Sequence, residues 1–185
     1  DYVVFSFYAT KAITSGHGGL IWSNKKNNIN YCKDYINFDF RKKYRERFNF
    51  LMSDFQAKIL LNQIKELKNY RLKKIKLFNQ FHNSIKNSNI SVFNHYNFDK
   101  DFIYRFILIF KNQKQRDKVK KQLYRSKIFT RVPVMQFELL HNYLKLNKKN
   151  YFISDQIAKT TLSIPFHNHL NSKNIKKINY HLKKI

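Results

Sequence analysis

The chain has 185 residues, with 37 Lys or Arg against 11 Asp or Glu, so its formal net charge is +26. A single cysteine, Cys32, excludes an internal disulfide framework and a CxxC metal site. The longest apolar run, residues 106–110, is far too short to span a bilayer, and no signal peptide is recognisable, so we expect a cytoplasmic protein.

Residues 1–23 are predicted to form a strand, a loop and a second strand, with the strands at residues 2–5 and 20–23. The loop between them holds Lys11 and, after it, all three glycines of the chain. Glycines this close together indicate backbone that turns sharply or lets another group approach closely. A lysine in such a loop can be desolvated, which lowers the pKa of its amine towards the nucleophilic neutral form.

The next segment is predicted to be irregular and then to enter a long helix. Residues 24–30 are polar and turn-rich, and residues 31–47 are aromatic, basic and loop-like. Ser53 is a predicted helix N-cap, and Gln56 follows at the spacing of a capping box. Apolar residues then recur with a helical period, which predicts an amphipathic helix to about residue 83.

The rest of the chain is predicted to alternate short strands and helices. Strands are predicted at residues 90–93 and 102–110, and at residues 128–134, where Pro133 confines the strand to an edge or an end. The predicted helices span residues 113–126, 154–160 and 172–183. Strands and helices in this order, after a long helix, indicate a small α+β domain.

Three short blocks carry the most specific sequence information. Residues 6–19 are SFYATKAITSGHGG, residues 48–57 are FNFLMSDFQA, and residues 162–167 are LSIPFH. In this order they resemble the patterns S-F-x-A-x-K-x-x-T-x-G-E-G-G, Y-N-Y-R-M-S-D-x-Q-A and L-S-L-P-x-H of the DegT/DnrJ/EryC1/StrS family of PLP-dependent sugar aminotransferases. The chain departs from these patterns at His17, where glutamate is usual, and at Leu51, where arginine is frequent.

The resemblance implies an α/β fold, the C-terminal portion of a PLP-dependent transferase of fold type I. Residues 1–50 would be the remnant of the PLP-binding large domain with its cofactor-lysine loop. Residues 51–185 would be the long helix and the small α+β C-terminal domain. The family is about twice this long, so we expect a partial gene model or the remnant of a broken gene, without the upstream parts that hold the cofactor's phosphate and ring.

The resemblance also implies roles for three residues. Lys11 would be the catalytic residue, forming a Schiff base with pyridoxal 5'-phosphate and carrying the proton during transamination. Ser6 would bind the cofactor phosphate through its hydroxyl, and Asn49 would reach the phosphate of the neighbouring subunit in a homodimer. Without the resemblance, Lys11 would be an ordinary surface lysine, Ser6 a serine that ends a strand, and Asn49 a turn residue. No metal site is expected, because His167 and His169 are more typical of a surface loop.

The implied reaction transfers an amino group from an amino acid, with glutamate the expected donor, to a nucleotide-linked keto-sugar. A lysine at position 11 favours an aminotransferase over the dehydratase branch of the family, which has histidine there. Leu51 cannot donate a hydrogen bond, so a contact with an acidic substrate would have to come from elsewhere, with Arg45 and Arg47 the nearest candidates in sequence. The departures at positions 51 and 17 leave the substrate and the donor open.

The large positive charge has two interpretations. It could serve a nucleic acid or an anionic membrane. Alternatively it reflects composition, since Lys, Asn, Ile, Phe and Tyr are abundant, as in AT-rich coding sequences, and the basic residues are spread along the chain. We favour composition, and expect neither a specific nucleic-acid partner nor a membrane partner. Two alternatives to an active enzyme stay open: an inactive fragment, and a basic nucleic-acid-binding protein on a degenerate aminotransferase scaffold.

Overall fold

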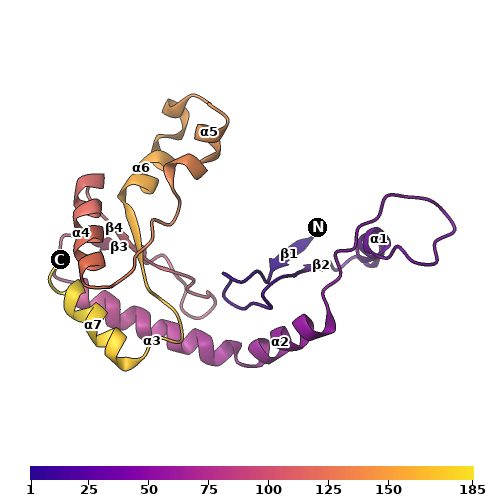
Figure 1. Ribbon diagram of the computed structural model, residues 1–185, viewed down its shortest axis with the longest axis horizontal. Helices are drawn as coiled ribbons and strands as arrows, with labels where there is room; N and C mark the ends of the chain where they lie inside the picture. The colour runs from indigo at the N-terminus through magenta and orange to yellow at the C-terminus, as the bar shows by residue number, and fades with distance from the viewer. The chain divides into compact units, whose positions relative to one another are not determined.

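A computed structural model describes residues 1–185 as two compact units, Asp1–Asn69 and Tyr70–Ile185 (Figure 1). The predicted mixture of helices and strands is confirmed, and all the paired strands are antiparallel. None of the helices is both long enough and apolar enough to cross a membrane. The division at residue 50, which the resemblance implies for the parent fold, stays a prediction.

The first unit begins with a β-hairpin that carries the lysine loop. Strand β1 (Val3–Ser6) pairs antiparallel with β2 (Gly19–Trp22), with Ser6 opposite Gly19. This confirms the predicted strand, loop and strand.

Helix α1 (Lys26–Ile36) follows where a turn and a loop were predicted, so that prediction was wrong. The helix is rich in asparagine, a weak helix former, which hid the regular spacing of its half-buried residues Ile29, Cys32 and Ile36.

The long helix predicted after residue 53 is present as two helices, α2 (Asp54–Lys65) and α3 (Leu67–Ile85). The predicted capping box is confirmed: the Gln56 amide N–H donates to Ser53 Oγ at 3.3 Å, and the Ser53 amide N–H donates to Gln56 Oε1 at 3.1 Å. Glu66, between the helices, ends α2, because its φ of −89° and ψ of 0° depart from helical values. The capping box orients α2, which approaches the lysine loop.

The second unit contains a three-stranded sheet in the order β3 (Ser91–Val92), β4 (Phe106–Ile109) and β5 (Thr161–Ile164). The first two strands lie inside the predicted ranges. Strand β5 was not predicted as a strand, because it follows a helix directly, without a turn signal.

The strand predicted at residues 128–134 was wrong. Only Arg131 forms a bridge there: it exchanges backbone hydrogen bonds with Ser163 at 2.9 and 2.7 Å. Pro133 has no amide N–H with which to extend the ladder.

Three predicted helices of this unit are confirmed with small shifts at their ends. They are α4 (Gln113–Arg125), α6 (Phe152–Thr160) and α7 (Ser172–Leu182). A connecting region of short helical turns was not predicted. It contains the 3₁₀ helix η1 (Gln136–Glu138), helix α5 (Leu140–Tyr143) and the 3₁₀ helix η2 (Lys148–Tyr151).

The apolar core of the chain lies in the second unit. The largest fully buried side chains come from α3, β4, β5, α4, α7 and the segment before β4, and they are Phe81, Ile103, Phe106, Leu108, Leu123, Leu162 and Leu182. The rings of Phe81 and Phe106 meet edge to face, with 5.5 Å between their centroids. Burial of each such side chain contributes roughly 1.5–3 kcal/mol, so this unit has its own driving force for folding.

Lys74 is the one lysine that the structure buries, and it lies at the edge of this core. Its Nζ donates to the Phe166 carbonyl oxygen at 2.5 Å and lies 4.2 Å from the centroid of the Phe166 ring. Burial lowers the pKa of Lys74 from 10.5 to about 8. The ammonium joins α3 to the segment that follows β5, at the expense of its hydration.

We predict that Lys74 makes the stability of the protein depend on alkaline pH. Between about pH 8 and 10.5 the unfolded state binds more protons at this site than the folded state does. The free energy of unfolding should therefore rise across this range, by up to about 3 kcal/mol, and this contribution is lost as the pH falls through 8. Urea unfolding at several pH values measures the slope, which Lys74→Met should reduce. Lys73→Met, at an exposed neighbour, should keep it, and equal slopes in all three proteins would refute the assignment.

Candidate active site

The loop that holds Lys11 is closed at its base by Phe7, one of only two buried apolar residues of the first unit. The Phe7 amide N–H donates to the Gly18 carbonyl at 2.9 Å, and the Phe7 carbonyl accepts from the Ser15 amide at 3.1 Å and from Thr14 Oγ1 at 2.9 Å. Residues 8–13 therefore form a projecting turn. Lys11 lies in it, and its amide N–H donates to the Tyr8 carbonyl at 2.9 Å.

Two glycines are required at the end of this loop. Gly18 has a φ of +123°, which L side chains rarely adopt, and a Cβ there would lie 2.4 Å from the Met52 side chain. A Cβ on Gly19 would lie 2.9 Å from the Phe5 carbonyl oxygen. The expectation that these glycines allow a close approach is confirmed, and the approaching groups are the segment before α2 and the neighbouring strand.

Gln63 of α2 ties the loop to the helix. The Thr14 amide N–H donates to Gln63 Oε1 at 3.0 Å, and Gln63 Nε2 donates back to the Thr14 carbonyl oxygen. The amide side chain thus pairs with Thr14 as a neighbouring strand would. Residues 63–67 resemble the family's Q-L-x-x-L pattern, but sequence reasoning gave Gln63 no role, because Thr14 is 49 positions away.

The structure brings two of the three predicted site residues onto one hairpin. Ser6 is the last residue of β1, and Lys11 lies in the loop that follows it; both side chains are exposed. Asn49, also exposed, lies on a separate segment, between Phe48 and Phe50, whose rings stack with 5.1 Å between their centroids. Because Lys11 is exposed, the 185 residues described do not by themselves supply the desolvation that was expected for it.

Arg45 and Arg47, the candidates to replace the arginine missing at position 51, are already engaged. Their guanidinium groups donate to the two carboxylate oxygens of Asp34, at 2.7 and 3.1 Å. Arg45 also lies 4.2 Å from the centroid of the Tyr35 ring. The hydrogen bonds from Arg47 and then Arg45 hold the pKa of Asp34 below its ordinary value. A substrate carboxylate at this place would have to share these arginines with Asp34.

The fold matches solved structures of aminotransferases. A DegT/DnrJ/EryC1/StrS aminotransferase from Brucella abortus matches 99% of this chain and 50% of its own, with a TM-score of 0.84 and 18% identity. Helicobacter pylori PseC, an aminotransferase involved in the biosynthesis of pseudoaminic acid, matches 99% of this chain and 52% of its own, with a TM-score of 0.78 and 18% identity. A Streptococcus pneumoniae protein solved in its PLP form matches 100% of this chain and 51% of its own, with a TM-score of 0.82 and 18% identity. The chain spans about half the length of these structures, and at such identities the likeness defines the fold alone.

The sequence itself gives the family. The sequence model of the DegT/DnrJ/EryC1/StrS aminotransferase family matches residues 1–183. The chain therefore belongs to the DegT/DnrJ/EryC1/StrS aminotransferase family, as its three sequence blocks predicted. None of the curated proteins matches it.

We predict that Gln63→Ala loosens the lysine loop without unfolding the second unit. The change removes both hydrogen bonds to Thr14, each worth about 1 kcal/mol, so amide exchange over residues 8–18 should accelerate by roughly tenfold or more. Hydrogen exchange followed by mass spectrometry measures this. Asn62→Ala, at the exposed neighbouring position, is the matched control and should leave the loop unchanged. Equal acceleration in both variants would mean that the tether does not hold the loop.

Proposed function

We propose that this chain supplies the cofactor-lysine part of a PLP-dependent sugar aminotransferase, and that it corresponds to the C-terminal half of the parent fold. The observation that carries the proposal is the Lys11 loop, a turn closed by Phe7, tied by Gln63 and built on two glycines, in a member of an aminotransferase family. The reaction would move an amino group from an amino acid, with glutamate the expected donor, to a nucleotide-linked keto-sugar.

The groups on this hairpin suit pyridoxal 5'-phosphate. An exposed primary amine and an exposed hydroxyl lie on the same short segment, at Lys11 and Ser6. The cofactor, when bound, supplies an aldehyde that condenses with a primary amine and a ring that stabilises negative charge on the neighbouring carbon.

Three residues of this chain have a definite task in the proposed reaction. Lys11 Nζ anchors the cofactor, and once it is released by the incoming amine it takes and returns the proton that transamination moves. Ser6 Oγ donates to a phosphate oxygen. Asn49 Nδ2 donates to the phosphate in the other subunit of a homodimer. This role does not require Asn49 to lie on the hairpin of its own subunit.

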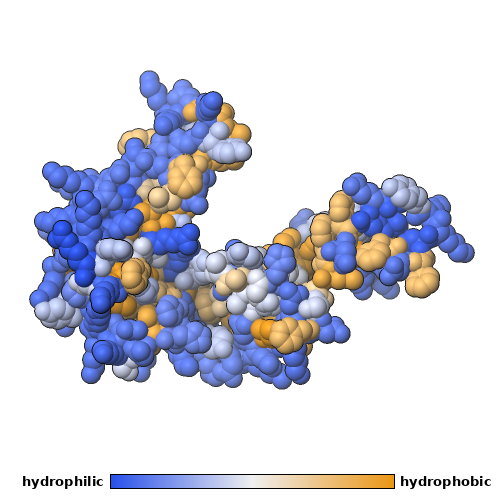
Figure 2. Space-filling view, viewed as in Figure 1, coloured by the Kyte–Doolittle hydropathy of each residue, from blue (hydrophilic) through white to orange (hydrophobic).

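The first unit presents an apolar surface that needs a cover. Both faces of the hairpin are exposed, including the opposed pairs Val4 with Ile21 and Val3 with Trp22. Figure 2 shows one face of this unit, with apolar surface around α1. Two-stranded hairpins with uncovered apolar faces are marginal in water, and apolar patches of this kind mark interfaces. We propose that the remainder of a larger sheet and its helices, the half of the parent fold that this chain does not match, occupies these faces.

Covering the hairpin would also complete the chemistry. Lys11 is exposed in the structure, whereas a lysine that acts as a nucleophile and a base near neutral pH must be at least partly desolvated. Polypeptide packed over the hairpin would exclude water from the loop and strengthen each polar contact to the cofactor. The chain without that cover would then be the inactive fragment considered above.

We predict that PLP is trapped on Lys11 rather than on the many other lysines. The test uses the protein with any residues that its reading frame encodes before Asp1, treated with stoichiometric PLP and reduced with borohydride. Peptide mapping should find the pyridoxyl group on Lys11, and Lys11→Arg should abolish it. Lys25→Arg, at another exposed lysine of the same unit, is the control and should leave it unchanged. Labelling spread over exposed lysines would overturn the assignment of Lys11.

We predict that the hairpin drives self-association of the 185-residue chain when it is alone. Val4→Lys places a charge on the apolar face and should shift sedimentation velocity profiles towards the monomer. Ile153→Lys, in the second unit, is a matched control, because Val4 and Ile153 are both 71% exposed and gain the same charge. An equal effect of the two variants would indicate simple charge repulsion, and the hairpin would not then be the interface.

A further inference from the structure

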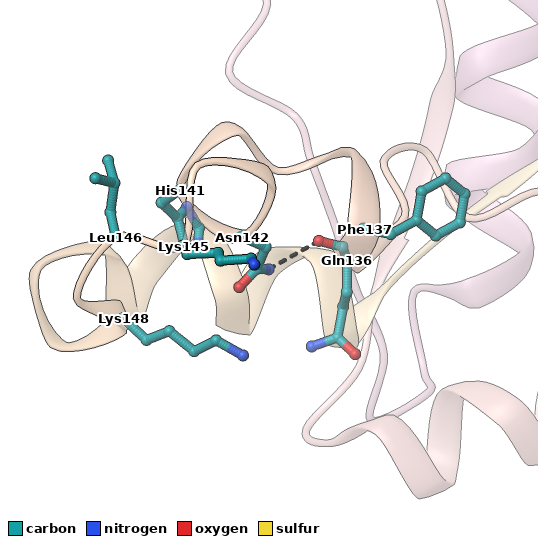
Figure 3. Close-up of a pocket in the computed structure, with 7 residues that line it drawn as sticks. All are labelled: Gln136, Phe137, His141, Asn142, Lys145, Leu146 and Lys148. Atoms are coloured by element: carbon teal, nitrogen blue, oxygen red, sulfur yellow. Dashed lines mark hydrogen bonds between the residues drawn. The ribbon is translucent and has the colours of Figure 1, made fainter.

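A second polar site lies in the connecting region of the second unit, and it shares no residue with the Lys11 loop. A pocket of about 490 Å³ opens there between η1, α5 and the turn before η2. Figure 3 shows four polar side chains around one opening, those of Gln136, Asn142, Lys145 and Lys148. The volume is typical of sites for small molecules.

The wall behind these side chains is a fixed polar cluster. His141 is 95% buried, its ring stacks on Tyr151 with 4.7 Å between centroids, and its Nε2 lies 3.3 Å from Asp155 Oδ1. Burial raises the pKa of Asp155, but contacts with His141, Asn142 and Lys159 outweigh it and hold the pKa below its ordinary value. Asp155 is thus a carboxylate that already has its partners, and no acidic side chain lines the pocket itself.

One buried polar atom at this pocket has no partner in the structure, Oδ1 of Asn142, whereas Nε2 of His141 faces Asp155. The amide of Asn142 cannot turn freely, because its Nδ2 donates to the Gln136 carbonyl at 2.8 Å and to Asp155 Oδ1 at 3.4 Å (Figure 3). An acceptor held in this way calls for a donor, since an unsatisfied buried polar group is costly. Asn142 and the exposed Lys145 both line the pocket.

Two lysines at the pocket, Lys145 and Lys148, favour an anionic group on the ligand. Lys145 and Lys148 bring two ammonium groups to the opening, without a carboxylate on the pocket wall to neutralise them. Lys145 also has a φ of +55°, a left-handed conformation that asparagine or glycine would adopt at less cost. A ligand that satisfies the site therefore combines an anion for the lysines with a hydroxyl donor for Asn142.

We propose that this pocket binds a hydroxyl-bearing phosphate monoester, in the chemical class of the sugar phosphates. The phosphate lies between the Lys145 and Lys148 ammonium groups, and a hydroxyl donates to Asn142 Oδ1. The Gln136 amide can donate to or accept from a second hydroxyl. The proposal does not depend on the reaction assigned to Lys11.

The test is a titration of the full chain with glucose 6-phosphate in 150 mM salt, followed by NMR of the backbone and side-chain amides. Methyl phosphate is the comparison, because it has the same charged group without the hydroxyls. We expect glucose 6-phosphate to bind at least tenfold more tightly and to shift the Asn142 side-chain signals. Equal affinity for the two phosphates would overturn the proposal.

The matched variants separate the pocket from the general charge of the chain. The double variant Lys145→Gln, Lys148→Gln should weaken glucose 6-phosphate binding at least tenfold. The double variant Lys114→Gln, Lys118→Gln removes the same charge from exposed positions on α4 and should change the affinity less than twofold. Equal losses in the two double variants would mean that the ester binds to overall charge, and the pocket would not be its site.

Discussion

The contact between Gln63 and Thr14 is the one on which the geometry of the lysine loop depends. A twelve-residue connection between two short strands has many conformations, and Phe7 fixes only its base. The side-chain amide of Gln63 satisfies both backbone groups of Thr14 and so fixes the far side of the loop against α2. The position of Lys11 is therefore set by a helix that begins more than forty residues later. The capping box at Ser53 starts that helix.

The two units differ in how they are stabilised. The second buries phenylalanine, leucine and isoleucine side chains from five elements in one core, whereas the first buries only Phe7 and Leu60 among its apolar residues. In the first unit, hydrogen bonds and the ion pairs of Asp34 do most of the ordering, and such contacts contribute little at exposed positions. The unit that holds the proposed catalytic lysine is thus the unit with the smaller apolar core.

The sequence predicted the elements whose cause is local. The capping box at Ser53 and the apolar period of α2 and α3 each act within a few residues, and both are present. Helix α1 was missed because asparagine-rich composition outweighs its weak apolar period. Strand β5 was missed because its pairing with β4 joins residues more than fifty positions apart.

The candidate site divides in the same way. Lys11 and Ser6 were predicted because a short motif carries them, and the structure has both on one hairpin, while their roles stay predictions. The role of Gln63 was not found, since it comes from a tertiary contact, and neither was the cluster of His141, Asn142 and Asp155, which joins two helices, α5 and α6, without a recognisable spacing. Motifs preserve the chemistry of a site, whereas the contacts that orient it are spread along the chain.

The lysines of this chain differ in whether they have a structural partner. With 37 basic and 11 acidic residues, most cations have no carboxylate to pair with, and their mutual repulsion works against a compact state. Lys74 meets this constraint by using carbonyl oxygens and an aromatic ring instead of an acid. Lys145 and Lys148 have no such substitute on the pocket wall. An anion that binds between them would therefore relieve repulsion as well as satisfy the pocket, so binding and stability are coupled there.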